Sequence, residues 1–163
     1  MKKLLLLFFV LVLFNGCASM YGPNAPVEMR SFEKIIEIPN VTKDEIYVKS
    51  NSWFVETFNS AESVIEYQDK EAGKIMGKYV FSYTEGLYFY NVKQTISIDI
   101  KDNRIRVSIY NPFSKITGDA LNGYNSGNSY KPLVTQAGID QARLQWNKLA
   151  KSLAESLNTN SDW

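Results

Sequence analysis

The stretch YFYNVKQTISIDIKDNRIRVSIYN, residues 88–111, decides the fold. Valine and isoleucine alternate with polar residues on both sides of the dipeptide Asp102-Asn103. Because neighbouring side chains of a strand point to opposite faces, this period of two predicts strands over 88–101 and 104–111. Asp and Asn both tolerate positive φ and favour a tight turn, so the stretch is predicted to fold as a β-hairpin with one apolar face.

Two further strands precede this hairpin, and they are expected at 63–68 and 74–83. We expect a five-residue turn at 69–73 and a four-residue turn at 84–87. With these turns the apolar residues of all four strands fall on one face, whereas a one-residue slip would turn that face outward. The expected cross-strand pairs are Ile100–Ile105, Ile98–Val107, Ile96–Ile109, Tyr90–Phe81, Val92–Tyr79 and Ile65–Gly77.

A strand at 32–38 and helices at 43–59 and 134–157 complete the predicted fold. Thr42 and Glu45 frame the first helix as a capping box, in which each side chain satisfies a free backbone amide. Apolar residues recur at helical spacing in both segments. The prediction is an α+β domain with a single antiparallel sheet of about five strands, in the order strand, helix, four strands, helix, and with both helices on one face. The apolar stripes hold Ile46, Tyr47, Trp53, Phe54 and Phe58, and then Ala142, Trp146, Leu149, Leu153 and Leu157.

The N-terminus has the layout of a secretory signal. Two lysines precede an unbroken apolar run at 4–14, and the dipeptide Gly16-Cys17 follows. The run has 11 residues, whereas a membrane-spanning helix needs about 20. The sequence LFNGC at 13–17 resembles a lipobox, which implies cleavage before Cys17 and acylation of this cysteine. The alternative is an ordinary secretory signal with a chance cysteine.

The expected organisation is a signal peptide at 1–16, a lipidated N-terminus with a flexible tether at 17–31, one domain at 32–158 and a frayed tail at 159–163. More than one acyl chain on a cysteine gives stable anchoring, since each buried methylene contributes about 0.8 kcal/mol. No acidic residue follows the cysteine directly. Under the lipobox resemblance this implies the outer membrane, facing the periplasm, with surface exposure as the alternative.

Composition excludes several function classes. The chain has no histidine and a single cysteine, so Ser-His-Asp and Cys-His catalysis and the usual zinc sites are not expected. Removal of 1–16 deletes two lysines and leaves 16 basic against 17 acidic residues. A chain without basic excess is a poor nucleic-acid binder. No metal or other cofactor is expected.

The stretches FNSAESVI at 58–65 and DKEAGKIMGK at 69–78, with the element order, resemble an uncharacterised-domain family, number 4468. The resemblance covers about residues 32–115. It implies a TATA-binding-protein-like fold in a secreted or lipidated envelope protein, and it supplies no catalytic residues. The DNA role of the TATA-binding protein does not transfer to a chain that is not basic. Small outer-membrane assembly lipoproteins are a rival resemblance, but they place two helices before a three-stranded sheet.

The sheet face opposite the helices is the first candidate binding surface. The expected register places Asp99 opposite Arg106 and Thr95 opposite Tyr110, and it places Lys78 opposite Lys93. Such a lysine pair suits an acidic partner or the charge of a glycan. A solvated face, with the lysines extended away from each other, is the alternative.

The second candidate surface is segment 111–131, which is expected to be a long loop. It combines Tyr124 and Tyr130 with Asn, Ser and Gly, a composition typical of adaptable recognition loops. Long loops in compact domains are commonly functional or disordered, so a mobile surface loop is the alternative.

The expected function is therefore a non-catalytic binding or assembly module in the periplasm. Its expected partners are the membrane, through acylated Cys17, and an envelope protein or glycan. A small carboxylate-dependent hydrolase or a glycan-binding protein is the alternative, and a structural or stress-response protein without one ligand is a third. The available carboxylates are Glu62, Glu66, Asp69, Glu71, Asp99 and Asp119.

Overall fold

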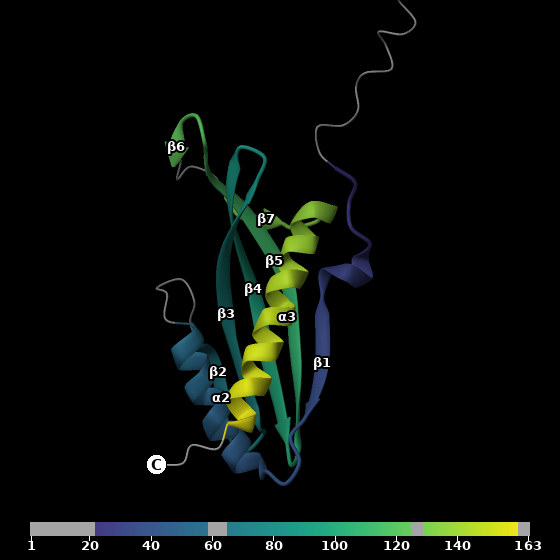
Figure 1. Ribbon diagram of the computed structural model, residues 1–163, viewed down its shortest axis with the longest axis vertical. Helices are drawn as coiled ribbons and strands as arrows, with labels where there is room; N and C mark the ends of the chain where they lie inside the picture. Colours follow the sequence, from purple (N-terminus) through teal and green to yellow (C-terminus); the bar gives the residue numbers. More distant parts are fainter. Residues whose placement is uncertain (1–21, 59–64, 125–128, 160–163) are drawn as a thin grey trace, which may run out of the picture.

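The computed structural model describes residues 22–58, 65–124 and 129–159. One antiparallel sheet has two helices on the same face (Figure 1), which confirms the α+β prediction. Its principal strands lie in the order β1-β5-β4-β3-β2, and β6 and β7 also pair with β5. The sheet thus has seven strands rather than about five. The strands are β1 (Phe32–Glu37), β2 (Ile65–Asp69), β3 (Lys74–Glu85), β4 (Tyr88–Lys101), β5 (Arg104–Asp119), β6 (Gly123–Tyr124) and β7 (Lys131–Pro132).

The helices begin where the sequence offers side-chain caps. The 3-10 helix η1 (Val27–Arg30) precedes β1, helix α2 (Lys43–Thr57) follows β1, and helix α3 (Gln136–Asn158) closes the domain. Thr42 and Glu45 form both halves of the predicted capping box at the start of α2. Thr135 accepts a bond from the amide of Gly138 at the start of α3. Capping of this kind fixes where each helix begins, because it satisfies amides that have no partner inside the helix.

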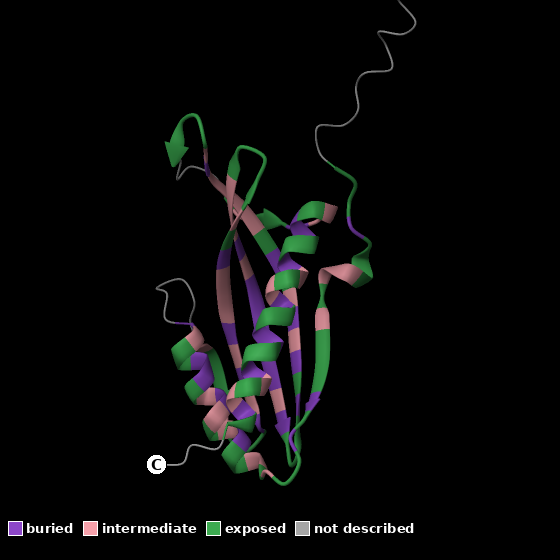
Figure 2. Ribbon diagram, in the orientation of Figure 1, coloured by how far each residue is buried: buried purple, intermediate pink, exposed green. Residues whose placement is uncertain are grey.

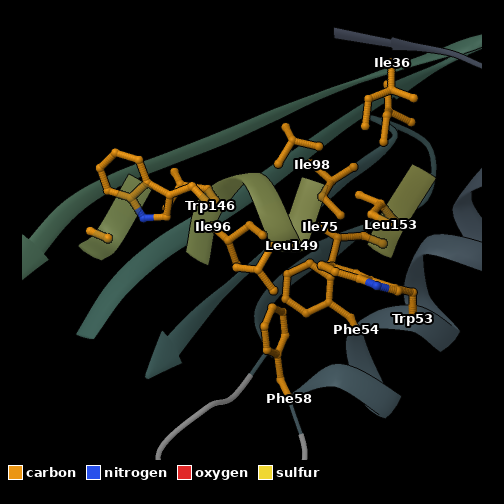
Figure 3. Packing of buried hydrophobic residues seen from close by; sticks show 14 of the residues in the cluster. Ile36, Trp53, Phe54, Phe58, Ile75, Ile96, Ile98, Trp146, Leu149 and Leu153 are labelled. Atoms are coloured by element: carbon orange, nitrogen blue, oxygen red, sulfur yellow. The ribbon is translucent and has the colours of Figure 1, made fainter. Parts of the chain in front are cut away.

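The core lies between the two helices and the sheet, where the buried residues gather (Figure 2). Figure 3 shows Trp53, Phe54 and Phe58 of α2 and its C-cap packed together beneath the isoleucines of the sheet. The rings of Phe54 and Phe58 lie 4.6 Å apart in an edge-on arrangement, which is a favourable aromatic geometry. From α3, Trp146 donates a buried hydrogen bond of 2.7 Å to Gln94 Oε1. The predicted stripes of both helices supply this core.

Most of the predicted registers are confirmed, and one is wrong. Ile100 pairs with Ile105, as predicted for the turn at Asp102-Asn103. Ile65 pairs with Gly77 as predicted, but the turn before β3 has four residues, 70–73, instead of five, and a bulge between Ile65 and Tyr67 makes up the difference. The turn between β3 and β4 has two residues instead of four, so Tyr90 pairs with Tyr83 rather than with Phe81. Because the slip is two residues, every side chain keeps its face. The pairs Ile98–Val107 and Ile96–Ile109 are also as predicted, while Val92 pairs with Phe81 instead of Tyr79.

Much of the expected loop at 111–131 is strand. Strand β5 continues to Asp119, and β6 and β7 then return along its free edge. Asn111 has a positive φ of 53° at the point where the pairing of β4 with β5 shifts. This irregularity reverses the alternation, because Ile109 before it and Pro112 after it are both buried. The loop prediction failed since a bulge lets a strand continue through Asn and Pro.

The N-terminal segment is attached to the domain from residue 23 onward. The Ala25 amide donates to Val134 O at 2.8 Å, the Gln136 amide donates to Pro23 O at 2.8 Å, and the Ala25 side chain is buried. Residues 23–31 are therefore held against the domain and do not form the expected flexible tether. The predicted signal peptide, Cys17 and most of the predicted tail lie outside the described residues. Within the described ranges, no helix is long and apolar enough to cross a membrane.

Candidate functional site

The uncovered face of the sheet divides into two parts, and the part nearer the Asp102-Asn103 turn is a neutralised network. Asp99 contacts Lys74 at 3.4 Å and Arg106 at 3.0 Å, which confirms the predicted Asp99–Arg106 pair. Lys78 contacts Glu66 at 3.4 Å and donates to Thr95 Oγ1 at 2.8 Å. Three basic side chains and two carboxylates leave this network with a net charge of +1, and each of the charges has an oppositely charged partner, so no cation here is unpaired.

The predicted pairing of Lys78 with Lys93 is wrong. Lys78 lies opposite Thr95, and Lys93 lies opposite Val80. The cause is the two-residue turn between β3 and β4, which shifts the register by two positions. The shift separates the two lysines, and on the other side of β3 Lys78 contacts the carboxylate of Glu66 in β2.

The second part of the face carries a lysine–tyrosine cluster, formed by Lys93, Lys115 and Tyr130. The ammonium nitrogens of Lys93 and Lys115 lie 4.4 Å and 4.9 Å from the centre of the Tyr130 ring. Both distances are within the range of cation–π attraction. Neither lysine forms an ion pair with a carboxylate in the described part of the chain. The cluster is therefore a positive, aromatic spot beside the neutralised network.

The bulge at Asn111 places Lys115 in this cluster. Before the bulge the odd-numbered residues of β5, such as Ile109, face the core. After the bulge the odd-numbered residues Phe113 and Lys115 face the other way, where Phe113 pairs with Lys93. Strand β7 pairs with residues 113–114 of β5 and so holds Tyr130 beside them. Sequence reasoning missed Lys115 because the strand was expected to end at 111, which placed this residue in the predicted loop. Asn111-Pro112 signals an irregularity, and a bulge there lets the strand continue.

The remaining predicted site residues lie in separate places. Thr95, Asp99 and Arg106 belong to the neutralised network, and Tyr110 lies half-buried opposite Thr95. Tyr124 is 87% exposed and lies at the far end of β5, where its ring contacts Phe89 with centres 5.7 Å apart. The structure thus joins Lys93 and Tyr130, one residue from each candidate surface, and leaves Tyr124 outside that cluster.

Four of the five described carboxylates named above are held in contacts: Glu66 and Asp99 in ion pairs, and Asp69 and Asp119 in hydrogen bonds. The Ala72 amide, followed by the Tyr67 hydroxyl, lowers the pKa of Asp69. The Asn122 side chain, followed by the amides of Asn122 and Leu121, lowers the pKa of Asp119. A general acid at neutral pH needs the opposite shift. No group of three potential metal-ligating residues occurs in the described part of the chain.

Two solved structures share this architecture. A DUF4468 family protein from Bacteroides ovatus aligns over 86% of this chain and 93% of its own, with a TM-score of 0.59 and 14% sequence identity. A TBP-like protein from Parabacteroides distasonis aligns over 76% of this chain and 91% of its own, also with a TM-score of 0.59 and 14% identity. At this identity the likeness shows the fold alone, and no curated protein matches the chain. The family model described as a domain of unknown function (DUF4468) with TBP-like fold matches residues 32–113, which is half of the chain, so the protein belongs to the DUF4468 family.

Proposed function

We propose that this protein is an envelope lipoprotein, anchored in the outer membrane through acylated Cys17, and that its domain is a non-catalytic binding module for an anionic group on a periplasmic partner. The observation that carries the binding role is the lysine–tyrosine cluster. Its two ammonium groups lie over one ring on a face that no described helix covers.

The electrostatics of the cluster favour an anion. Two positive charges near one ring repel each other, and the cation–π attraction of about 0.5–1 kcal/mol at an exposed site offsets only part of that repulsion. A carboxylate that binds beside this ring would accept a charge-assisted hydrogen bond from an ammonium group and offset the repulsion. The neighbouring network gains nothing from the same ligand, since Asp99 already lies between Lys74 and Arg106.

The membrane anchor rests on the lysines, apolar run and lipobox-like sequence at residues 2–17. A multiply acylated cysteine would hold the domain at a bilayer permanently. The binding role is favoured over hydrolysis because Asp69 and Asp119 have lowered pKa values, and because Glu66 and Asp99 are ion-paired.

The binding role is tested by charge reversal followed by crosslinking in the native cells and mass spectrometry. In the test variant Lys93→Glu is combined with Lys115→Glu. The matched control combines Lys101→Glu with Lys148→Glu, which has the same change in net charge at exposed positions away from the cluster. We expect the wild type and the control to recover one abundant envelope partner and the test variant to lose it. Equal recovery from all three proteins would refute the cluster as the binding site.

The anchor is tested separately by the mass of the N-terminal peptide and by cell fractionation. Acylation adds the mass of the fatty chains to Cys17. We expect the wild type in the membrane fraction. A protein in which residues 1–17 are replaced by an ordinary cleavable secretory signal is expected in the soluble periplasmic fraction. An unmodified Cys17 would contradict the lipoprotein assignment and leave the binding test valid.

A further inference from the structure

Four large side chains at one end of the molecule are exposed to solvent. Leu87 is 54% exposed, Tyr88 44%, Leu121 80% and Tyr124 87%. Leu87 lies in the turn between β3 and β4 and Leu121 in the turn between β5 and β6, and both turns are drawn as exposed in Figure 2. Tyr88 and Tyr124 lie in the strands that follow these turns, β4 and β6. Turns of this kind usually carry small polar residues, so leucines at two turn positions need a reason. We call these four residues the tip patch.

The two turns form one surface. The Ala120 amide in the second turn donates to Leu87 O in the first, at 2.8 Å. Tyr124 of β6 contacts Phe89 of β4 with ring centres 5.7 Å apart. The apolar side chains are therefore gathered at a single blunt end, which is the arrangement that marks an interaction site rather than scattered surface residues.

The chain enters the domain at the same end. Figure 1 shows the described N-terminal segment rising toward the end of the sheet that carries β6 and the β3–β4 turn. Asn24 forms a β-bridge with Thr135, and Pro23 O accepts the amide of Gln136, so residues 23–25 are held beside the start of α3. Only five residues separate Cys17 from Gly22 along the chain, counting Gly22. Such a segment spans at most about 18 Å when fully extended.

We infer that the tip patch rests in the interfacial layer of the bilayer that carries the acylated Cys17. This inference depends on the proposed lipid anchor and adds an orientation to it. The short connection keeps this end near the membrane, and tyrosine side chains favour the membrane–water interface, where their rings are apolar and their hydroxyls remain hydrated. In this orientation the two turns contact the membrane, and strands β3, β4 and β5 point away from it.

The charges around the patch define the type of contact. Residues 85–89 and 119–124 contain two acidic residues, Glu85 and Asp119, and no basic residue. Attraction to anionic lipid is therefore absent at the turns, and contact depends on apolar burial. The lysine–tyrosine cluster lies on a sheet face, several residues along β5 from the turn, and in this orientation it remains open to periplasmic partners.

The test uses the acylated protein in vesicles of phosphatidylethanolamine and phosphatidylglycerol. A Leu121→Cys variant carries an environment-sensitive fluorophore on the new thiol, because acylation blocks Cys17. The matched control is Val55→Cys on α2, an aliphatic position with 61% exposure. Lipids with a quencher near the headgroup are added to both. We expect strong quenching and a blue-shifted spectrum for the Leu121→Cys label. The Val55→Cys label should have the spectrum of a water-exposed label. High salt should leave both results unchanged.

The possible outcomes separate the two proposals. An acylated, vesicle-bound protein whose Leu121→Cys label stays in water would overturn the tip contact and leave the lipid anchor standing. A label that is shielded in cell membranes but exposed in pure lipid vesicles shows that a protein covers the tip, which also overturns the inference. If the mass of the N-terminal peptide shows no lipid on Cys17, the proposed anchor fails and the inference that rests on it fails with it.

A second variant tests the patch without a label. Leu87→Ser combined with Leu121→Ser removes the two leucines from positions exposed to water, so folding is expected to be unaffected. In the acylated protein we expect accessibility of residues 85–89 and 119–124 to a water-soluble modifying reagent to rise about tenfold in vesicles. When neither protein carries the lipid and no vesicles or detergent are present, the same reagent should react equally with the variant and the wild type. Equal protection of variant and wild type in vesicles would contradict the proposed contact.

Discussion

The two ends of the long strands β3, β4 and β5 differ in how their side chains are covered. Near the Asp102-Asn103 turn, these strands are flanked by β1 and β2, and one face is covered by α2 and the last part of α3 (Figure 1). The charges of the uncovered face are paired there. Near the Gly86 turn, the short strands β6 and β7 replace these neighbours, and leucine and tyrosine side chains extend into water.

The two ends have different roles: the first stabilises the fold, and the second offers surface for recognition. Buried apolar area and paired charges are concentrated at the first end, which therefore supplies most of the free energy of folding. The second end keeps surface that folding does not use, namely the tip patch and the lysine–tyrosine cluster. Extending β3, β4 and β5 beyond the core is a way to present such surface on a rigid support.

The largest expected effect comes from truncation of a core side chain. Phe54 is fully buried between Trp53 and Phe58, so Phe54→Ala is expected to lower the free energy of unfolding by about 3–5 kcal/mol. Leu121→Ala, at the exposed end, should change it by less than about 0.5 kcal/mol. Urea denaturation of the two variants measures the contrast. Similar losses would show that the tip is part of the cooperative core.

The glycines of two hairpin turns give a second, smaller contrast. Gly73 and Gly86 both have positive φ, at 66° and 57°. A Cβ at Gly73 would lie 2.5 Å from the backbone oxygen of Ile100, whereas one at Gly86 would meet nothing within 4 Å. Gly86→Ala should therefore cost about 1 kcal/mol, from φ alone. Gly73→Ala should cost about 2–3 kcal/mol, because φ strain and a backbone clash add.

Thermal unfolding of both glycine variants measures this difference. A Gly73→Asn variant serves as a check, since Asn tolerates positive φ better than Ala but carries the same Cβ. If Gly73→Asn recovered full stability, φ strain alone would explain the loss. Equal costs at Gly73 and Gly86 would contradict the closer packing of the first end.

Removal of a paired charge and removal of an unpaired charge should differ by about 1 kcal/mol in their effect on the free energy of unfolding. Asp99→Asn removes the partner of Lys74 and Arg106 and should lower the free energy of unfolding by up to about 1 kcal/mol at low salt. Because the Debye length falls to about 3 Å at about 1 M salt, most of this loss should then disappear. Lys115→Met should be neutral or slightly stabilising, since it relieves repulsion from Lys93. A clear loss of stability upon Lys115→Met would show that Lys115 contributes to folding, which would contradict a role in binding alone.

Sequence reasoning predicted the fold where the pattern was regular. The alternation of β4 with the first part of β5 gave both strands, their turn and the Asp99–Arg106 pair. The capping box at Thr42 gave the start of α2. These features depend on neighbouring residues, so a local pattern is sufficient to predict them.

The candidate site was predicted only in part, because it depends on irregular backbone. The turn at Gly86 has two residues, and this length decides that Lys93 lies away from Lys78. The bulge at Asn111 decides that Lys115 faces Lys93 and Tyr130. Composition does not give the length of a turn or the position of a bulge, although Asn before Pro indicates that regular pairing is interrupted there.

The smallest predicted effect concerns the turn that carries Leu121. The Asn122 side chain, followed by the amides of Asn122 and Leu121, lowers the pKa of Asp119 below its ordinary value of 3.8. The carboxylate should therefore stabilise this turn fully above that value and lose the contribution as pH falls through the lowered pKa. In a carbon NMR titration, Asp119 should have a midpoint below 3.8, and the amide signals of Leu121 and Asn122 should follow it. Asp119→Asn should abolish this response, whereas a midpoint at or above 3.8 would show that the carboxylate does not order the leucine that we place at the membrane.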